Sequence, residues 1–326
     1  MKVVVFGLGS MGKRRIRLLK KYDSSIYIFG IDKNEERRRL CEEEFGIETV
    51  CNLESIVNRN EINCAFVCSS PLSHSKIITE CLEQKIHVFT ELNLVSDGYE
   101  HNIDLAKSNN LTLFISSTFI YRDEIKKIKS LVMNGNRLLN YSYHVGQYLP
   151  DWHPWEKYQD FFVSQKRTNA CREIFAIELP WLTYVFGDIS KITVSKSKIS
   201  SLHIDFNDNY IVIIEHITGH KGMLAVDIVS RKAVRNLEIF GEDSFIQWNG
   251  SPDGLKLYDI DNKKDIAINL YDQIDQLKQY SHFVVENAYY NEIVAFFDAV
   301  NENKNAAYNF EEDHKILKII DIIEAD

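Results

Sequence analysis

The sequence predicts a two-domain α/β protein, and three observations lead to this prediction. The chain has 326 residues, more than one ordinary hydrophobic core needs and a suitable length for two domains. Within residues 1–120, short apolar runs alternate with charged segments of helical period. Within residues 190–270, strand-like runs follow one another without helices between them. We therefore expect a parallel-sheet domain over 1–120 and an α+β domain with a large, mostly antiparallel sheet over 121–326.

The strands expected in the first domain are continuously apolar rather than alternating, as is typical of strands buried on both faces. They cover residues 2–6, 26–31, 62–68, 86–90 and 111–116. The charged, helix-period segments between them cover residues 11–22, 34–45, 73–84 and 98–109. Strands and helices that alternate at this spacing indicate βαβ units and a parallel sheet covered on both faces.

The alternation of short strands and helices ends at about residue 120, where the second domain begins. A helical stretch over 122–134 precedes an extended run over 141–148 and an aromatic-rich loop over 149–162. The strand-like runs that follow read ISKITVS, YIVIIEH, GMLAVDIVS, NLEIFG and SFIQW. Helical patterns over 286–302 and 311–324 close the chain.

Composition and charge exclude several classes of protein. No stretch of about 18 uncharged apolar residues occurs, so we expect no membrane span. Most of the net charge of −9 falls in residues 121–326, which argues against a nucleic-acid partner because phosphates need clustered cations. The basic run over 13–21 contains interleaved apolar residues and predicts the solvated face of an amphipathic helix.

The cysteines and histidines indicate neither disulfides nor metal. The six cysteines form no CxxC pair, which is typical of reduced thiols in a cytoplasmic protein. His216 and His220 are four residues apart, but a glycine turn lies between them, so we expect no metal site.

A glycine motif follows the first expected strand. In GLGSMG, residues 7–12, Gly7 permits a tight turn, Gly9 lets the backbone approach a pyrophosphate, and Gly12 lets the helix pack on the strand. Ser10 and Met11 then begin a helix whose N-terminus attracts phosphate. Asp32 follows the second strand and can accept hydrogen bonds from both adenosine ribose hydroxyls. The motif predicts a Rossmann dinucleotide-binding domain that prefers NAD, while nearby Lys33 and Arg37 leave NADP open.

The chain as a whole resembles the glucose–fructose oxidoreductase/inositol dehydrogenase family, Gfo/Idh/MocA. The resemblance rests on the glycine motif, on CSSPLSH over 68–74 and on HVFTELNL over 87–94. It implies that Glu91 lies near the nicotinamide at the end of a strand. It also implies cofactor contacts from the residues that follow the preceding strand, namely Ser69, Ser70, Pro71 and His74. For His74, a hydrogen bond at the start of the next helix is an equal alternative.

Two departures from the family pattern concern catalysis. In the family the glutamate is followed by lysine and proline, which Leu92 and Asn93 replace here. The family also has a glycine-rich turn and a helix with an aspartate and a histidine. In the corresponding stretch, 168–187, these two fall at or near Ile174 and Ile177, and only the acidic residue Glu178 survives.

Two hypotheses follow. In the first, the protein is an NAD(P)-dependent oxidoreductase that acts on a sugar or nucleotide-sugar, with proton-transfer groups supplied by the interdomain loop. His153 is the first choice because an unperturbed histidine titrates nearest to neutrality, and Tyr158 and Lys166 come next, with His144 and Tyr148 as further candidates. In the second, the protein binds nucleotide without catalysis, as a regulatory or scaffold subunit.

The substrate contacts expected under the first hypothesis combine flat aromatic rings with hydrogen-bonding tips, which suit a sugar. They are Arg122, Gln147, Trp152, Trp155 and Glu178. For the strand-rich second domain we expect a sheet face that pairs with another copy, giving a homodimer or homotetramer.

Overall fold

The computed structural model describes residues 1–326 except 136, 153–156, 278–282, 303 and 326. The chain forms two compact units, one of residues 1–117 with 289–317 and one of residues 118–288 with 318–326. Within the described ranges, no helix combines the length and apolarity that crossing a bilayer requires.

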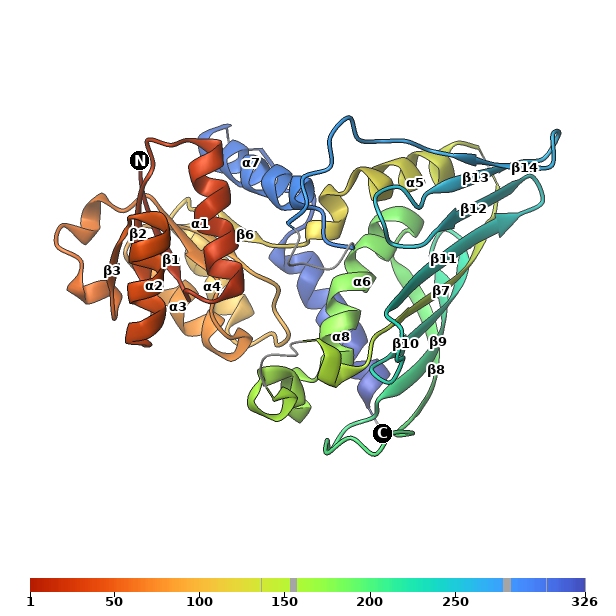
Figure 1. Ribbon diagram of the computed structural model, residues 1–326, viewed down its shortest axis with the longest axis horizontal. Coiled ribbons are helices and arrows are strands. Elements are labelled where there is room, and N and C mark those ends of the chain that lie inside the picture. The colour runs from red at the N-terminus through yellow and green to blue at the C-terminus, as the bar shows by residue number, and fades with distance from the viewer. Residues whose placement is uncertain (136, 153–156, 278–282, 303, 326) are drawn as a thin grey trace. The chain divides into compact units, whose positions relative to one another are not determined.

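The first unit is built on a parallel sheet in the strand order β3-β2-β1-β4-β5-β6 (Figure 1). Its strands are β1 (Lys2–Phe6), β2 (Tyr27–Ile31), β3 (Glu48–Val50), β4 (Cys64–Val67), β5 (His87–Thr90) and β6 (Leu113–Ile115). Its connecting helices are α1 (Ser10–Tyr22), α2 (Glu35–Phe45), α3 (Pro71–Glu83) and α4 (Tyr99–Ser108). The chain order reverses beside β1, which pairs with both β2 and β4, so the ligand crevice of this sheet class lies at the carboxyl ends of β1 and β4.

Residues 289–317 return to this unit, which differs from the sequence-based division after residue 120. They hold most of α7 (Glu286–Glu302) and the first part of α8 (Phe310–Glu324). The reason is aromatic packing. The Phe296 ring meets the rings of Phe66 and Phe89 edge-on, at centroid distances of 5.2 and 5.7 Å.

The second unit contains a sheet in the order β14-β13-β12-β11-β7-β10-β9-β8. Its strands are β7 (Asn140–Gly146), β8 (Ile189–Ser197), β9 (Asn209–His216), β10 (Lys221–Asp227), β11 (Val234–Gly241), β12 (Ser244–Trp248), β13 (Lys256–Asp259) and β14 (Lys264–Ala267). The pair β7–β10 is parallel and the other pairs are antiparallel, which confirms the predicted mostly antiparallel sheet.

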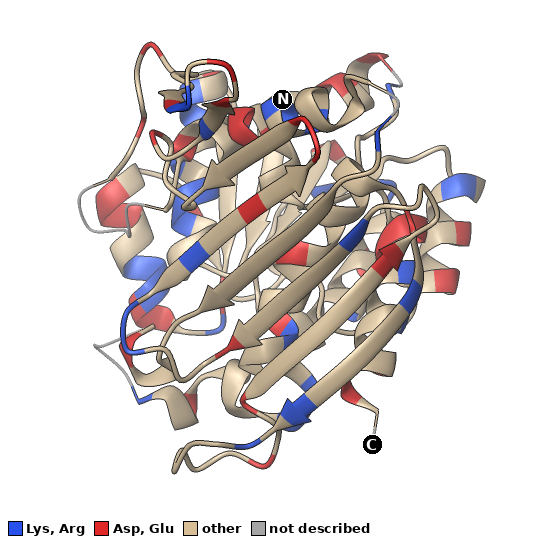
Figure 2. Ribbon diagram, turned by 90° about the vertical axis from the view of Figure 1, so that its right-hand side faces the viewer, with Lys and Arg blue, Asp and Glu red and all other residues tan. Residues whose placement is uncertain are grey.

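The two faces of this sheet differ. Helices α5 (Asp123–Met133) and α6 (Ala170–Phe186) lie on one face (Figure 1). Figure 2 looks onto the other face, which none of the described helices of this unit covers. Side chains alternate accordingly along β9, where Val212 and Ile214 are fully buried while Ile211 and Ile213 are 44% and 52% exposed.

Candidate functional site

The turn between β1 and α1 shows which of its glycines the fold itself requires. Gly7 has φ +85°, and a Cβ there would lie 2.7 Å from the Cys68 carbonyl oxygen. A Cβ on Gly12 would lie 1.9 Å from the Gly7 carbonyl oxygen. Gly9 is different, because the nearest atom to an added Cβ is Arg37 Nη1, 4.0 Å away. Packing therefore explains Gly7 and Gly12, whereas the bare backbone of Gly9 leaves room for a ligand.

This open backbone lies where a dinucleotide phosphate binds in a Rossmann fold. Gly9 is the N-cap of α1 and carries no side chain to cap the helix, and Ser10 and Met11 form its first turn. A helix N-terminus attracts anions through its N–H groups and its dipole. The residues present thus fit a pyrophosphate at Gly9.

Asp32 is oriented toward the same turn. The Leu8 N–H donates to Asp32 Oδ2 at 2.8 Å, and the Asn34 N–H donates to Oδ1 at 2.8 Å. Each carboxylate oxygen has two acceptor sites, so Asp32 retains capacity for ribose hydroxyls. Arg37 Nη1 lies 3.9 Å from Oδ2 and is more than half exposed.

Ser69, Ser70 and Pro71 follow β4 and form the other side of the crevice. An added Cβ on Gly7 would lie 2.8 Å from the Ser69 Cα, so this segment packs directly on the glycine turn. The hydroxyls of Ser69 and Ser73 are 2.7 Å apart, and Pro71 is the first residue of α3. The structure therefore brings the predicted residues Gly7, Gly9 and Ser69 together at the carboxyl ends of β1 and β4.

Glu91 has a buried partner that the sequence analysis missed. Arg15 Nε donates to Glu91 Oε1 at 2.6 Å, and Arg15 Nη2 donates to Glu292 Oε2 at 2.7 Å. Arg15 is fully buried and Arg14 is 5% exposed, so the prediction that the basic run is a solvated helix face is wrong for both. The cation explains how a carboxylate is tolerated at the end of β5, and a cofactor contact from Glu91 stays a prediction.

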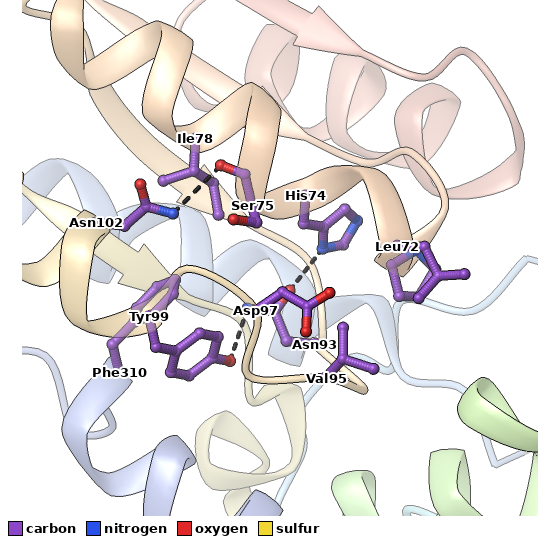
Figure 3. A pocket seen from close by; sticks show the side chains of 11 residues that line it. Leu72, His74, Ser75, Ile78, Asn93, Val95, Asp97, Tyr99, Asn102 and Phe310 are labelled. Atoms are coloured by element: carbon purple, nitrogen blue, oxygen red, sulfur yellow. Dashed lines mark hydrogen bonds between the residues drawn. The ribbon is translucent and has the colours of Figure 1, made fainter.

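His74 lies in a buried polar cluster rather than on an open surface. Its Nε2 is 2.9 Å from the Ser69 carbonyl oxygen and its Nδ1 is 2.7 Å from Asn93 Oδ1 (Figure 3). Burial lowers the pKa of His74. Asn93, at the position of the family proline, thus binds the histidine, while Leu92 offers no group that transfers a proton.

Glu178 and Arg122 are held by the interior of the second unit. Glu178 is fully buried and accepts from Tyr143 Oη at 2.7 Å, Trp181 Nε1 at 2.6 Å and Arg235 Nη2 at 2.6 Å. Arg122 is 2% exposed and pairs with Glu124 at 2.5 Å. Neither of the two predicted substrate contacts therefore has a free charge to offer.

The loop candidates differ in their surroundings. His153 and Trp155 lie outside the described residues. Trp152 Nε1 donates to the Gln147 carbonyl oxygen at 3.1 Å, and Tyr158 Oη accepts from the His203 N–H at 3.1 Å. These hydrogen bonds hold the loop to itself and to the segment before β9.

Lys166 lines a cavity in the second unit of about 240 Å³. Asn169 and Glu324 line the same cavity, and Asn169 Nδ2 donates to Glu324 Oε1 at 2.6 Å. On the sheet itself, His144 of β7 has its Nε2 2.7 Å from Oδ2 of Asp227 on β10, so this candidate already has a carboxylate partner.

Glu173 is a titratable residue that the sequence analysis did not consider. It lies in the first turn of α6, and its Oε2 is buried without a hydrogen-bond partner among the described residues. Burial raises the pKa of Glu173 to about 7. The neighbouring Arg172 is paired with Asp321 at 2.7 Å and with Glu324 at 2.5 Å. Glu173 precedes the residue assigned to the family aspartate, so a shift of one position in the comparison would have found it.

Residues 1–117 match the family model GFO_IDH_MocA, described as an oxidoreductase family with an NAD-binding Rossmann fold. This match covers the first unit up to Ser117 and does not extend into the second unit. The predicted NAD-type cofactor domain is thereby confirmed, and so is the predicted resemblance over these residues.

One curated relative and two solved structures extend the comparison. Myo-inositol 2-dehydrogenase from Thermotoga maritima is 30% identical over 138 residues, which cover 41% of this chain and 41% of that protein. Levoglucosan dehydrogenase in complex with NADH has a TM-score of 0.82 at 14% identity, covering 99% of this chain and 95% of that one. UDP-N-acetylglucosamine 3-dehydrogenase from Acidithiobacillus ferrooxidans has a TM-score of 0.74 at 14% identity, covering 99% and 96%. At these identities the solved structures establish the fold of this chain.

Proposed function

We propose that this protein is an NAD-dependent oxidoreductase that acts on a hydroxyl or carbonyl group of a sugar or nucleotide-sugar. The observation that carries the proposal is the open backbone at Gly9, which packing does not require and a bound pyrophosphate does. Asp32 favours NAD over NADP because its carboxylate would repel a 2′-phosphate. The sugar substrate is supported by the relatives, a myo-inositol dehydrogenase and dehydrogenases of levoglucosan and UDP-N-acetylglucosamine.

Hydride transfer to or from an alcohol carbon requires a proton acceptor or donor in the protein. Bound NAD would supply the nicotinamide that exchanges hydride with the substrate. Glu173 is our first candidate for the proton because its Oε2 is unpartnered among the described residues. With a pKa near 7 it holds a proton below neutrality and can accept one above it. His153, Tyr158 and Lys166 remain candidates from the sequence.

The substrate-binding role of the aromatic loop is part of the proposal. Trp152 and Gln147 are half-buried and lie on the loop that precedes α6. An indole face packs well on the CH face of a sugar ring, and an amide can bind hydroxyls. Trp155, Arg122 and Glu178 belonged to the same predicted set, but the pairing of Arg122 and Glu178 makes them supports of the fold rather than substrate contacts.

We further propose that the open face of the second sheet pairs with a second copy of the chain, in a cytoplasmic homodimer or a dimer of dimers. Met223 lies opposite Ile213 in the β10–β9 register, and Ala225 lies opposite Ile211. These neighbours form an apolar patch, at one end of which Glu215 pairs with Lys191 and Lys221. A patch of this kind, paired with itself about a twofold axis, closes an assembly.

The alternative is a nucleotide-binding subunit without catalysis. The observation that favours it is the pair of apolar residues Leu92 and Ile177 at or near the positions of the family lysine and histidine. A screen of sugars and nucleotide-sugars, followed by NADH absorbance, separates the two functions. Turnover of any substrate supports the enzyme, and NAD binding without turnover across the screen supports the subunit.

The assay with a substrate that the screen finds to be turned over is then repeated with the variant Glu173→Gln. Turnover should fall by about two to four powers of ten while NAD affinity is unchanged. Asp188→Asn, an exposed carboxylate just after α6, is the matched control and should retain activity. If Glu173→Gln is active and Tyr158→Phe or Lys166→Met is not, the proton role moves to the loop.

A further inference from the structure

Buried side chains of the first unit form an unbroken hydrogen-bonded chain that ends beside the glycine turn. From Ser69 it runs through His74 and Asn93, as Figure 3 shows. Asn93 Nδ2 donates to Tyr99 Oη at 2.8 Å, and Tyr99 Oη donates to Asp313 Oδ2. The side chains of this chain come from α3, the β5–α4 loop, α4 and α8, and each is at most 3% exposed.

The contacts of His74 limit how many protons His74 and Asp313 must hold between them. Both ring nitrogens face a carbonyl oxygen, of Ser69 and of Asn93. A neutral imidazole has one N–H, so it can donate to only one of these oxygens. All four contacts from Ser69 to Asp313 are favourable in two cases: His74 carries two protons and Asp313 none, or each carries one and the Asn93 amide is turned over.

These two arrangements contain the same number of protons. In the first, donation runs from His74 toward a carboxylate at Asp313. In the second, a protonated Asp313 donates to Tyr99, Tyr99 to Asn93 Oδ1, and the Asn93 amide to His74 Nδ1, so His74 Nε2–H still donates to Ser69. A cavity of about 10 Å³, roughly the room of one water molecule, lies beside His74, Asn93 and Tyr99 and gives the amide space to turn.

We propose that Asp313 is a positioning residue for the cofactor site, which acts through Tyr99, Asn93 and His74 to hold the Ser69 carbonyl beside the glycine turn. The inference rests on the proposed NAD binding. Ser69 is the link, because its Cα would lie 2.8 Å from a Cβ on Gly7. In the orientation that the structure records, Asn93 Nδ2 donates to Tyr99 and Tyr99 donates to Asp313, so a neutral His74 must donate from Nδ1 to Asn93 Oδ1. Loss of the shared proton then leaves the lone pair of His74 Nε2 against the Ser69 carbonyl, and the Ser69 segment loses a hydrogen bond.

The titratable groups around these side chains include Asp97, which lines the same small cavity as His74, Asn93 and Tyr99 (Figure 3). Tyr308 Oη also donates to Asp313, at 2.8 Å, and Thr90 Oγ1 lies 3.2 Å from His74 Nδ1. The nearby charges are paired elsewhere, Glu91 with Arg15 and Glu311 with Lys107. The His314 ring lies 5.6 Å from that of Tyr99. Burial raises the pKa of Asp313 to about 6, so the shared proton leaves as pH rises through about 6.

The test is NADH fluorescence titration at pH 5.5 and pH 8. For the wild-type protein the affinity should be about three- to tenfold weaker at pH 8, the worth of one net hydrogen bond. Asp313→Asn should remove this dependence and keep the tight binding at pH 8, because an amide donates to Tyr99 at every pH. Glu311→Gln, an exposed carboxylate on the same helix, should behave as the wild type does.

If Asp313→Asn changes the stability of the protein, the variant Tyr99→Phe separates that change from an effect on the cofactor site. Tyr99→Phe breaks the chain between Asn93 and Asp313, so adding Asp313→Asn to it should no longer change NADH affinity at pH 8. The proposal is overturned if wild-type affinity is the same at both pH values, or if Asp313→Asn binds as weakly as the wild type at pH 8. Failure to bind NADH at any pH would instead refute the proposed function.

Discussion

At the scale of single residues, Arg15 shows how the first unit tolerates buried carboxylates. It is fully buried and pairs with Glu91 and Glu292. Arg15→Met should reduce the free energy of unfolding by roughly 3–5 kcal/mol, because both carboxylates lose their cation in a buried site. Urea denaturation measures this. Arg39→Met removes an exposed ion pair with Glu43 and should cost at most about 0.5 kcal/mol. Similar losses for both variants would contradict the account.

A second residue-scale prediction concerns Glu173 and pH. Its folded pKa, near 7, lies above the ordinary value of 4.5, so the folded state binds the proton more tightly than the unfolded state. Stability contributed by this group is complete below pH 4.5 and is lost as pH rises through 7. Glu173→Gln should therefore be more stable than the wild type at pH 8.5, by about 1–3 kcal/mol, and nearly equal at pH 5. Equal stabilities at pH 8.5 would refute a buried carboxyl here.

At the scale of structural elements, the turn between β1 and α1 separates folding from binding. An added Cβ has room at Gly9 but overlaps the Gly7 carbonyl at Gly12. Gly9→Ala should keep the melting temperature of the wild type and lose at least about tenfold in NAD affinity, because the methyl group occupies the phosphate position. Gly12→Ala, in contrast, should lower the melting temperature in addition to the NAD affinity, because its Cβ overlaps the Gly7 carbonyl oxygen. Calorimetry and titration of the same samples decide, and undiminished NAD affinity in Gly9→Ala would contradict the assignment.

The same elements show what the sequence could predict. Five of the six strands of the first sheet were predictable because they are apolar runs, and the glycine turn was predictable because its spacing and Asp32 follow strands. Strands β3 and β14 are short and have no buried residues, so no apolar pattern marks them. The partner of Arg15 is unpredictable in principle, because Glu292 is 277 positions away in the sequence. The pairing of Glu178 follows from side chains on β7 and β11 that converge only in the folded unit.

At the scale of the whole molecule, the open sheet face predicts an assembly. Ile213→Lys or Met223→Lys places a charge in the apolar patch and should convert the dimer or tetramer to monomer at micromolar concentration. Ile260→Lys is the matched control, since Ile260 is 47% exposed outside the patch. Sedimentation velocity measures the change. A wild-type protein that sediments only as a monomer, or patch variants that stay associated, would contradict the proposed interface.

The central claim is that the chain binds NAD through Gly9 and Asp32 in order to oxidise or reduce a substrate. Calorimetric titration of NAD and NADP into the wild-type protein and into Asp32→Ala tests it most directly. We predict that NAD binds at least about tenfold more tightly than NADP to the wild type, and that Asp32→Ala loses this preference. Binding of neither cofactor at millimolar concentration, or an unchanged preference in Asp32→Ala, would contradict the account.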